Sequence, residues 1–485
     1  MSDHLARSPT DGFETDTSSI QAATEDIIAS HIPLAPGPPP TLNRNAHLQY
    51  LVRNLSQGFP AKYTSQDASQ PWLMFWTVQS FSVLQVGLDP VNKQKIIDTG
   101  MAWQHPEGGF GGGPGQAAHL LPTYAAVCAL ANVGRSGPGG GWDQIDRDKI
   151  YKFFMSLKQP DGSFLVTHHA EVDVRGIYCL LSVAYLLNML TPELVAGTPA
   201  FVASCQTYEG GFSSASQPYF SEATPSPSSL LASPRPALGE AHGGYAFCAL
   251  ASWVMLQPFL ADPAAPDAPR VNYKKLTRWL TQLQGAEVEL GGLKGRTNKL
   301  VDGCYSWWVG GSFAFLGALG VGHDLEPATS HDEAATDDWH DADDSLLNRT
   351  ALQEYILCAG QHPAGGLRDK PPKAADSYHT LYCLSGLSAA QHNLLPSPPR
   401  RAQLLDAWHP ASPADPLNDL RKHAYADALS WTEEEGTANI FGGVQNRVNA
   451  THPLFNLTIS HAEAMMAHFY EQEVLPRAVS SRTAA

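Results

Sequence analysis

The stretch "EGGFGGGPGQAAHLLPTYAAVCAL", residues 107–130, joins a glycine-rich turn to an apolar helix, and the same unit recurs along the chain. In each copy the helix begins with Asp, His or Thr close to a Tyr. Further copies span 160–184, 209–252, 289–311, 364–387 and, in degenerate form, 439–460. One helix-turn-helix unit cannot bury its apolar face alone, so repeated units must stack against each other.

The spacing of apolar residues predicts helices and no strands. Trp72, Phe75 and Trp76 recur at three to four residues, as do Tyr178 and Leu181, and strand-like alternation is absent. An all-α repeat protein follows, either an open solenoid or a closed ring of hairpins. A solenoid would keep one period, whereas these repeats are separated by irregular inserts. We therefore favour an α-α barrel.

The barrel is expected to form one catalytic domain over residues 45–476. Residues 1–44 are poor in apolar side chains and are predicted to be a disordered arm, and 477–485 a tail. Loop inserts are expected near 213–238, 258–271, 322–348 and 393–436. The third insert holds nine acidic side chains and no Lys or Arg, which predicts a solvated loop.

Composition excludes several classes of protein. The 485 residues are 43% hydrophobic, which is enough for a large core, but no apolar run is long enough to span a membrane. The N-terminus is polar and acidic, unlike a secretory signal. The net charge of −16 makes a nucleic-acid-binding protein a poor candidate. Seven widely spaced cysteines are typical of reduced thiols in a cytosolic protein.

The starts of the second helices carry the residues that suggest chemistry. If the hairpins close into a ring, these ends meet at one aromatic cavity with a few ionisable groups at its rim. Such a cavity would suit a long apolar ligand with a charged head. The residues are His119, Tyr124, Arg175, Tyr178, His242, Tyr245, Asp302, Cys304, Tyr305, Asp376, Tyr378, His379 and Tyr382.

Asp302 and Cys304 lie two positions apart in "NKLVDGCYSWWVGG", residues 298–311. Alone they are explained as a helix-capping Asp and a buried Cys. His379, in "DSYHT" on an equivalent helix of another repeat, makes a metal site more attractive. Oxygen, sulfur and nitrogen ligands suit zinc, and three protein ligands with one open position are typical of catalytic zinc.

Arg296 and Lys299 directly precede this motif. Two cations close to phenols suit a diphosphate, whose oxygens accept charge-assisted hydrogen bonds. The alternative is a solvated surface run. Similarly, each tryptophan or tyrosine by itself is explained by core packing.

These motifs together resemble the β subunits of protein prenyltransferases, and among them those of protein farnesyltransferases. The matching stretches occur in order between residue 45 and about residue 470. They include "QPWLMFW" (70–76), "HPEGGFGGGPGQ" (105–116), "LKQPDGSF" (157–164), "EVDVR" (171–175), "EAHGGY" (240–245) and "NKLVDGCYS" (298–306). The family fold is an α-α barrel, in agreement with the ring expected above.

The resemblance implies a role for each matching residue, with Asp302, Cys304, His379, Tyr305 and Lys299 as the catalytic group. The zinc ligands would be Asp302, Cys304 and His379, with one Zn²⁺ per subunit. Diphosphate would bind to His242, Arg296, Lys299 and Tyr305. The isoprenoid pocket would consist of Trp72, Tyr124, Arg175, Tyr178, Tyr245, Cys248, Trp308 and Tyr382. The peptide pocket would consist of Ala68, Ser69, Trp72, Trp76, His119, Leu121, Pro122 and Tyr378. Asp369 matches a carboxylate associated with assistance by Mg²⁺.

The implied reaction transfers farnesyl from farnesyl diphosphate to the Cys of a C-terminal CaaX sequence, as in Ras-like GTPases. The implied partner is a helical-repeat α subunit. Large residues at the pocket floor, Trp72 and Tyr382, favour farnesyl over geranylgeranyl, and so does Asp369, where geranylgeranyl relatives carry Lys. Leu121 departs from the Ala usual in the family, which leaves the preference at the last CaaX residue open.

Three alternatives stay open at this point. The first is a geranylgeranyltransferase type I β subunit. The second is a terpene cyclase, because "DDWHD" (337–341) and "DADD" (341–344) match cyclase patterns, although such matches are expected by chance in so acidic a tract. The third is a non-catalytic helical-repeat scaffold.

Overall fold

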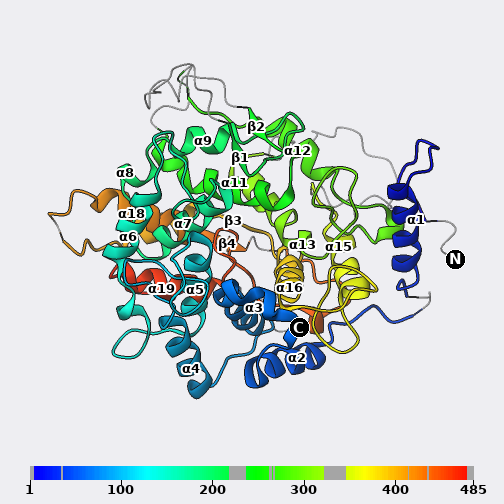
Figure 1. Cartoon of the computed structure of the whole chain (residues 1–485), viewed down its shortest axis with the longest axis horizontal. Helices are drawn as coiled ribbons and strands as arrows, with labels where there is room; N and C mark the ends of the chain where they lie inside the picture. Colours follow the sequence, from blue (N-terminus) through cyan, green and yellow to red (C-terminus); the bar gives the residue numbers. More distant parts are fainter. Residues whose placement is uncertain are drawn as a thin grey trace, which may run out of the picture.

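The computed structural model describes residues 5–33, 37–217, 236–260, 265, 268–321, 346–412, 414–433 and 436–477. Within these ranges the chain is mainly helical, and the few strands are two or three residues long (Figure 1). Almost all of the predicted insert 322–348 lies outside the described residues, and so do all of the acidic motifs at 337–344. The same holds for most of 213–238 and part of 258–271.

Six apolar segments form an inner ring, and each packs against the next. One of the six consists of two short helices, α13 and α14. Helix α3 contacts α5, α5 contacts α7, α7 contacts α11, α11 contacts α13 and α14, and α13 contacts α16, which returns to α3. Their bounds are α3 (Gln70–Val83), α5 (Leu120–Val133), α7 (Val174–Leu186), α11 (Gly243–Leu256), α13 (Tyr305–Trp308), α14 (Ser312–Ala318) and α16 (Ser377–Gln391). The closed contact between α16 and α3 confirms the predicted α-α barrel.

Shorter or more polar helices surround this ring and precede the inner helices in the chain (Figure 1). They are α2 (Arg44–Gln57), α4 (Pro90–Met101), α6 (Arg147–Leu157), α9 (Thr198–Ser204), α12 (Tyr273–Thr281) and α15 (Arg349–Tyr355). Composition explains the two layers. Helix α11, "GGYAFCALASWVML", is apolar and almost wholly buried, whereas α12, "YKKLTRWLT", buries only Leu276, Trp279 and Leu280.

Four of the inner helices, α5, α7, α11 and α16, begin at an Asp or His, as the sequence predicts, and this side chain caps the first turn. His119, Asp173, His242 and Asp376 each accept a hydrogen bond from a backbone N–H two or three residues further on. These bonds satisfy donors that a helix leaves free at its N-terminus. They also fix the ends of the helices from which the candidate site residues project.

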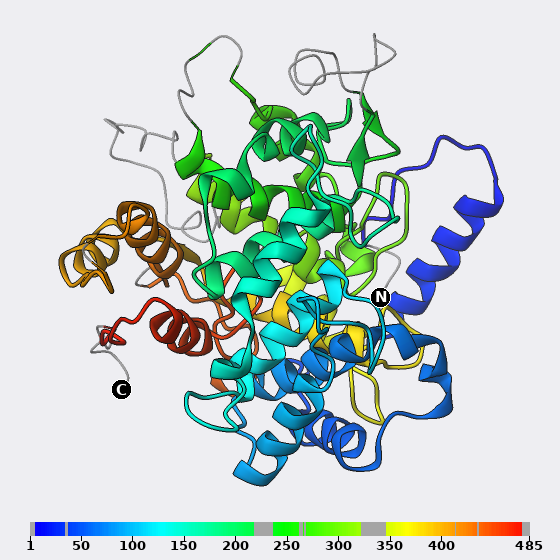
Figure 2. The same ribbon diagram turned by 60° about the vertical axis from the view of Figure 1, so that its left-hand side comes forward.

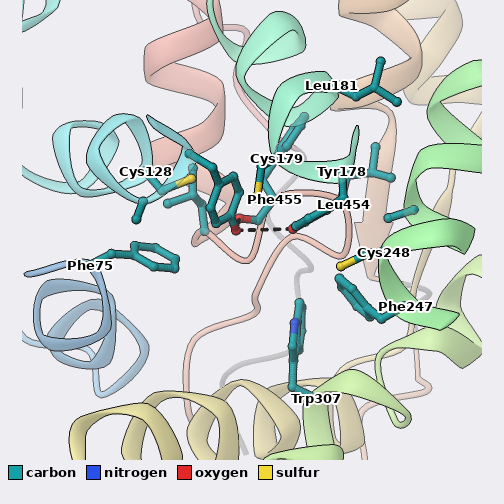
Figure 3. Close-up of a cluster of buried hydrophobic side chains, with 14 of the residues drawn as sticks. Phe75, Cys128, Tyr178, Cys179, Leu181, Phe247, Cys248, Trp307, Leu454 and Phe455 are labelled. Atoms are coloured by element: carbon teal, nitrogen blue, oxygen red, sulfur yellow. Dashed lines mark hydrogen bonds between the residues drawn. The ribbon is translucent and has the colours of Figure 1, made fainter. Parts of the chain in front are cut away.

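The other end of the ring is filled by residues 446–458 and α19 (Ile459–Phe469). The Asn449 N–H donates to Val83 O, at the end of α3, over 2.9 Å. The Tyr124 hydroxyl donates to Phe455 O over 2.8 Å. Figure 3 shows Leu454 and Phe455 among side chains of the inner helices, such as Tyr178 and Phe247. The ring is therefore blocked at this end, and access is from the N-terminal ends of the inner helices.

Part of the predicted disordered arm, residues 1–44, is helical, and for that part the prediction is corrected. Residues Asp16–Ala29 form helix α1, which begins with a capping box at Thr15 and packs on the 3-10 turn η5 (Glu287–Glu289). Figure 2 shows α1 on the flank of the barrel. Low apolar content misled the prediction, because α1 docks mainly through polar contacts, such as that of Gln21 with Glu289.

The predicted insert 393–436 has secondary structure of its own. Strands β3 (Leu394–Pro396) and β4 (Trp431–Glu433) pair antiparallel, and α17 (Pro398–Asp406) and α18 (Asn418–Leu429) pack together between them. A second pair, β1 (Ala215–Ser216) and β2 (Ala237–Leu238), joins the ends of the insert 213–238. The remaining short elements are α8 (Pro192–Val195), η2 (Ala61–Ser69), η3 (Trp142–Gln144), η4 (Gln257–Phe259), η6 (Ile356–Gly360) and η7 (Val444–Asn446).

No helix in the described ranges is long and apolar enough to cross a membrane. All seven cysteines are free thiols, as the sequence predicts.

Candidate active site

Asp302, Cys304 and His379 meet at the open end of the ring. A carboxylate oxygen, the Sγ atom and an imidazole nitrogen of these residues all lie within 4.8 Å of one another. Asp302 and Cys304 lie just before α13, and His379 lies in the first turn of α16. Two segments 75 or more residues apart in the sequence thus bring an oxygen, a sulfur and a nitrogen donor to one point.

Backbone contacts fix the turn that carries two of these donors. The Asp302 N–H donates to Leu293 O over 3.0 Å, and the Gly303 N–H donates to Asp369 O over 2.7 Å. The Cys304 N–H donates to Asp302 Oδ1 over 2.9 Å. A Cβ on Gly303 would lie 2.5 Å from the Sγ of Cys383, so only glycine fits here. The turn is held tightly between two neighbouring loops.

The two ring nitrogens of His379 have different partners. Nδ1 lies 2.7 Å from Asp376 Oδ2 and donates to it, whereas Nε2 lies 3.2 Å from Asp302 Oδ1. Burial disfavours the charged ring, but the hydrogen bonds to Asp302 and Asp376 raise the pKa of His379 to about 10. A cation bound at Nε2 would take the place of this proton.

The electrostatics around Cys304 fit a bound divalent cation. Burial, reinforced by the negative charge of Asp302, raises the pKa of the Cys304 thiol well above its ordinary value. A buried thiol beside a carboxylate therefore becomes a thiolate only when a positive charge lies next to it. A mixed set of carboxylate, thiolate and imidazole, with Nδ1 of the imidazole bonded to a carboxylate, matches what zinc accepts.

His242 and Tyr305 form a second polar pair at the rim. Nδ1 of His242 accepts the Gly244 N–H over 3.0 Å, so Nε2 carries the proton and donates to the Tyr305 hydroxyl oxygen over 3.1 Å. Burial, together with the charges of Arg296 and Arg175, lowers the pKa of His242 to about 4. The imidazole is therefore neutral near pH 7, and the hydroxyl hydrogen of Tyr305 is left to donate to a ligand.

Arg296 and Lys299 lie on the loop beside this pair, and the carboxylate of Glu240 faces them. Arg296 forms an ion pair with Glu240, and this hydrogen bond is the main cause of the lowered pKa of Glu240. The pair is partly exposed, with 38% of the Arg296 side chain and 54% of the Glu240 side chain accessible. An anionic ligand can therefore compete with Glu240 for the guanidinium.

An aromatic cavity of about 380 Å³ lies inside the ring below this rim. That volume is within the range of small-ligand pockets, roughly 300–1,000 Å³. It is lined by Trp72, Trp76, Leu121, Arg175, Tyr178, Cys179, His242, Gly244, Tyr245, Cys248, Trp308, Tyr378 and Tyr382. Eleven of these residues are predicted from the sequence, and the two that it missed are Cys179 and Gly244.

The rings of the wall pack against one another. Trp308 lies 4.4 Å from Tyr382 between ring centroids, and its indole N–H donates to the Tyr378 hydroxyl over 2.9 Å. Trp72 and Trp76, on α3, lie 5.8 Å apart. Such packing holds flat apolar faces in fixed orientations.

Arg175 also belongs to this wall and is fixed from two sides. Asp173 accepts hydrogen bonds from its Nε and Nη2, and the guanidinium carbon lies 5.2 Å from the centre of the Tyr245 ring. The ion pair holds the cation at the mouth of the cavity. Asp173 and Glu240 are supporting carboxylates that the predicted site did not include, whereas Asp376 was predicted only as a helix start near the cavity.

Several predicted site residues do not line the cavity. Tyr124 is buried behind it, bonded to Phe455 O and to the Tyr178 hydroxyl. Asp369 forms an ion pair with Lys370, and burial, together with the nearby Asp302, raises the pKa of Asp369. Outside the cavity lining lie Ala68 and Ser69 at the end of η2, His119 as the cap of α5, Pro122 in its first turn, and Arg296, Lys299, Tyr305 and the three ligands at the rim.

Known proteins resemble this chain in both sequence and fold. The family model "Prenyltransferase alpha-alpha toroid domain" matches residues 42–457. Protein farnesyltransferase subunit beta of Schizosaccharomyces pombe is 36% identical over 377 residues, which cover 78% of this chain and 85% of that protein. The subunit from Pyricularia oryzae is 36% identical, over 73% of this chain, and the chain spans 64% of its length.

Among solved structures, Candida albicans protein geranylgeranyltransferase-I complexed with GGPP has a similar fold. The TM-score is 0.57 at 16% sequence identity, and the match covers 90% of this chain and all of that one. A likeness at this identity concerns the fold alone. The family model and the relatives at 36% identity together establish that the chain belongs to the prenyltransferase α-α toroid family of enzymes, among the β subunits of protein farnesyltransferases.

Proposed function

We propose that this chain is the catalytic β subunit of a zinc-dependent protein farnesyltransferase, which transfers farnesyl to the Cys of C-terminal CaaX sequences. The observation that carries the proposal is a set of three zinc-type donors, within 4.8 Å of one another, at the mouth of an aromatic cavity. Family membership supports the reaction class, and the donors and the cavity support its chemistry.

Asp302, Cys304 and His379 would hold one Zn²⁺, which, when bound, supplies the positive charge that keeps a substrate thiol deprotonated at neutral pH. Asp376 orients the imidazole, because its carboxylate accepts the Nδ1 proton and leaves Nε2 facing the other two donors. Because catalytic zinc in proteins keeps one ligand position open, three protein donors would leave one for the substrate sulfur.

Four groups would bind the diphosphate and stabilise the charge that develops on it as the prenyl carbon departs: His242, Arg296, Lys299 and Tyr305. Tyr305 donates its hydroxyl proton outward because its oxygen already accepts from His242. Arg296 would release the Glu240 carboxylate and bind a phosphate oxygen instead. The diphosphate is the stronger partner because it carries more negative charge than one carboxylate. Asp369, close to Asp302, would be the carboxylate for an assisting Mg²⁺.

The cavity would hold the isoprenoid chain and part of the acceptor peptide. Its aromatic faces exclude water and tolerate partial positive charge on the reacting carbon. Trp72 and Tyr382 both line it, and their bulk limits the length of chain that fits. This favours farnesyl over geranylgeranyl diphosphate. Leu121 lines the same cavity and would narrow the peptide side.

The enzyme would act as a heterodimer with a prenyltransferase α subunit, as its family membership implies. We assign it to the cytoplasm, because seven unpaired cysteines are typical of proteins in a reducing compartment. Its acceptors would be CaaX-ending proteins such as Ras-like GTPases.

The test is to co-express the chain with a protein prenyltransferase α subunit and to measure zinc and prenyl transfer on the same preparation. One zinc per heterodimer and transfer of farnesyl to a CaaX peptide are expected. Cys304→Ala should lose both the zinc and the transfer. Cys358→Ala, a half-buried thiol on the outer layer, is the matched control and should keep both.

Zinc that persists in the Cys304→Ala variant would contradict the proposed site. Bound zinc with transfer of geranylgeranyl in preference to farnesyl would instead support the type I geranylgeranyltransferase alternative. An absence of zinc and of transfer in the wild-type heterodimer would favour a non-catalytic scaffold.

A further inference from the structure

A buried carboxylate that the proposed chemistry does not use lies behind the loop that carries Arg296 and Lys299. Glu289, at the end of η5, is 0% exposed. Its side chain accepts from the Ala286 N–H over 3.0 Å and forms an ion pair with Lys294 over 3.3 Å. A buried charge is tolerated only when it is paired and hydrogen-bonded. The remaining hydrogen-bond donors to Glu289 therefore contribute to keeping this buried charge stable.

Those partners come from the N-terminal arm, which we define as residues 5–33. Gln21, on α1, donates from Nε2 to Glu289 Oε1 over 2.8 Å, and the Ser8 hydroxyl donates to Oε2 over 3.3 Å. The arm also pairs its backbone with η5, because the Val288 N–H donates to Ala6 O over 3.1 Å. A segment 268 residues away in sequence thus completes the shell of hydrogen bonds around Glu289.

The ion pair of Glu289 leads directly to the candidate active site. Its partner Lys294 forms an antiparallel bridge with Val301, and the neighbouring Leu293 O accepts the N–H of Asp302 over 3.0 Å. Residues 293–302 therefore form a small hairpin, which carries the two loop cations and ends in a predicted zinc ligand. Glu289 anchors the first strand of this hairpin.

The arm makes a second contact on the other side of the same turn. Nε2 of His31 accepts from Nη2 of Arg368 over 3.2 Å, since Nδ1 of His31 donates to Ile27 O. Arg368 is 6% exposed, and its Nε donates to Ala359 O. The next residue, Asp369, accepts the Gly303 N–H over 2.7 Å. The arm thus touches both segments that hold residues 302 and 303.

We propose that the N-terminal arm positions the active site: through Gln21 and Ser8 it fixes Glu289, and Glu289 fixes the hairpin 293–302 relative to His379. The arm contacts no predicted ligand of the metal or diphosphate, so its residues are positioning residues. The expected effect on prenyl diphosphate binding rests on the proposed function. The expected effect on the order of the hairpin does not.

The test is amide hydrogen exchange of the full chain in complex with a prenyltransferase α subunit. In the double variant Ser8→Ala/Gln21→Ala, the amides of Lys294 and Asp302 should exchange roughly tenfold faster, as expected on loss of hydrogen bonds to a buried charge. Thr17→Ala is the matched control, because this exposed residue lies on the same helix. It should leave the hairpin unchanged.

A second measurement separates positioning from general stability. The dissociation constant of farnesyl diphosphate should rise severalfold in the double variant, while the unfolding temperature stays close to that of the control. Gln21→Asn, which keeps an amide donor on a shorter side chain, should give an intermediate effect on exchange.

Unchanged exchange of the hairpin, together with faster exchange of α1, would overturn the proposal and leave the arm as a surface helix. Faster exchange of the hairpin with unchanged affinity would also overturn the positioning role. If the wild-type complex binds neither zinc nor farnesyl diphosphate, the proposed function fails, and the exchange result still decides whether the arm orders the hairpin.

Discussion

His379 is the residue on which the proposed metal site depends most, because its two ring nitrogens face different carboxylates. Asp376 accepts the Nδ1 proton over 2.7 Å and also caps α16 by accepting the His379 N–H over 2.8 Å. Both contacts fix the ring with Nε2 towards Asp302 and Cys304. The sequence predicted Asp376 as a helix start, but its position three residues before the ligand gives it a second role.

Asp376→Ala is predicted to weaken zinc binding about 10- to 100-fold, the range found when a carboxylate that orients a metal-bound histidine is removed. Competition with a chromophoric chelator measures the change. Asp376→Asn keeps the cap through its single side-chain oxygen but places an NH2 group where Oδ2 accepts from Nδ1, so it should lose zinc affinity much as Asp376→Ala does while the helix start is retained. Equal zinc affinity in the wild type and in Asp376→Ala would show that this carboxylate only caps the helix.

His452 makes the stability of the fold depend on pH. It is fully buried, Nδ1 accepts the Leu454 N–H, and Nε2 donates to Ala428 O over 2.8 Å. Burial lowers its pKa to about 3, whereas the unfolded chain binds the proton with an ordinary pKa near 6.5. The unfolded state therefore gains a proton first as the pH falls.

The free energy of unfolding is predicted to fall below about pH 6.5, by up to about 1.4 kcal/mol per pH unit from this residue, until the pH nears 3. Denaturant titrations between pH 7 and pH 4 measure the slope. His452→Gln removes the titrating ring and should make the slope shallower by about one proton. The same slope in both proteins would exclude His452 as a source of the acid sensitivity.

At the scale of elements, the inner helices explain why much of the site could be predicted from the sequence. Helix periodicity places Trp72 and Trp76 on one face of α3, and Tyr178 and Arg175 on the inner side of α7. Closure of the ring then brings these faces to one cavity. Periodicity cannot show which rings are exposed to the cavity, and Tyr124 is buried behind it.

Trp72→Ala on α3 is predicted to shift the substrate preference towards geranylgeranyl diphosphate. Removal of the indole leaves space beside Trp76, where the longer chain would extend. The ratio of kcat/KM for geranylgeranyl over farnesyl diphosphate should rise roughly 10- to 100-fold, since a few methylenes in an apolar pocket change binding by a few kcal/mol.

The matched control is Trp279→Phe, a conservative change of a buried tryptophan on the outer helix α12. It should leave the ratio unchanged. If Trp72→Ala lowers kcat/KM for both diphosphates equally, Trp72 does not limit the length of the chain.

At the scale of the whole molecule, the features hardest to predict involve contacts between distant segments. The sequence gives no sign that α1 docks on η5 or that 446–458 fills one end of the ring. Polar side chains and backbone groups make the contacts of α1 with η5, and the buried apolar residues of 446–458, such as Leu454 and Phe455, lie in an irregular segment, so hydrophobic periodicity reports neither. The ring itself was predictable because every repeat carries the same turn and the same apolar face.

The supporting carboxylates illustrate the same limit. Asp173, Glu240 and Asp376 hold Arg175, Arg296 and His379 respectively. Each carboxylate stands in a recognisable sequence motif, yet only the fold shows which cation or ring it contacts. The positions of charged side chains are therefore known only once the loops are placed.

The central claim is that Asp302, Cys304 and His379 bind one Zn²⁺ with a fourth position open to substrate. X-ray absorption at the zinc edge of the heterodimer tests it most directly. The account predicts one sulfur at about 2.3 Å and nitrogen or oxygen ligands at about 2.0–2.2 Å, with a second sulfur on addition of a CaaX peptide. A zinc centre with no sulfur ligand, or one that gains none with the peptide, would contradict it.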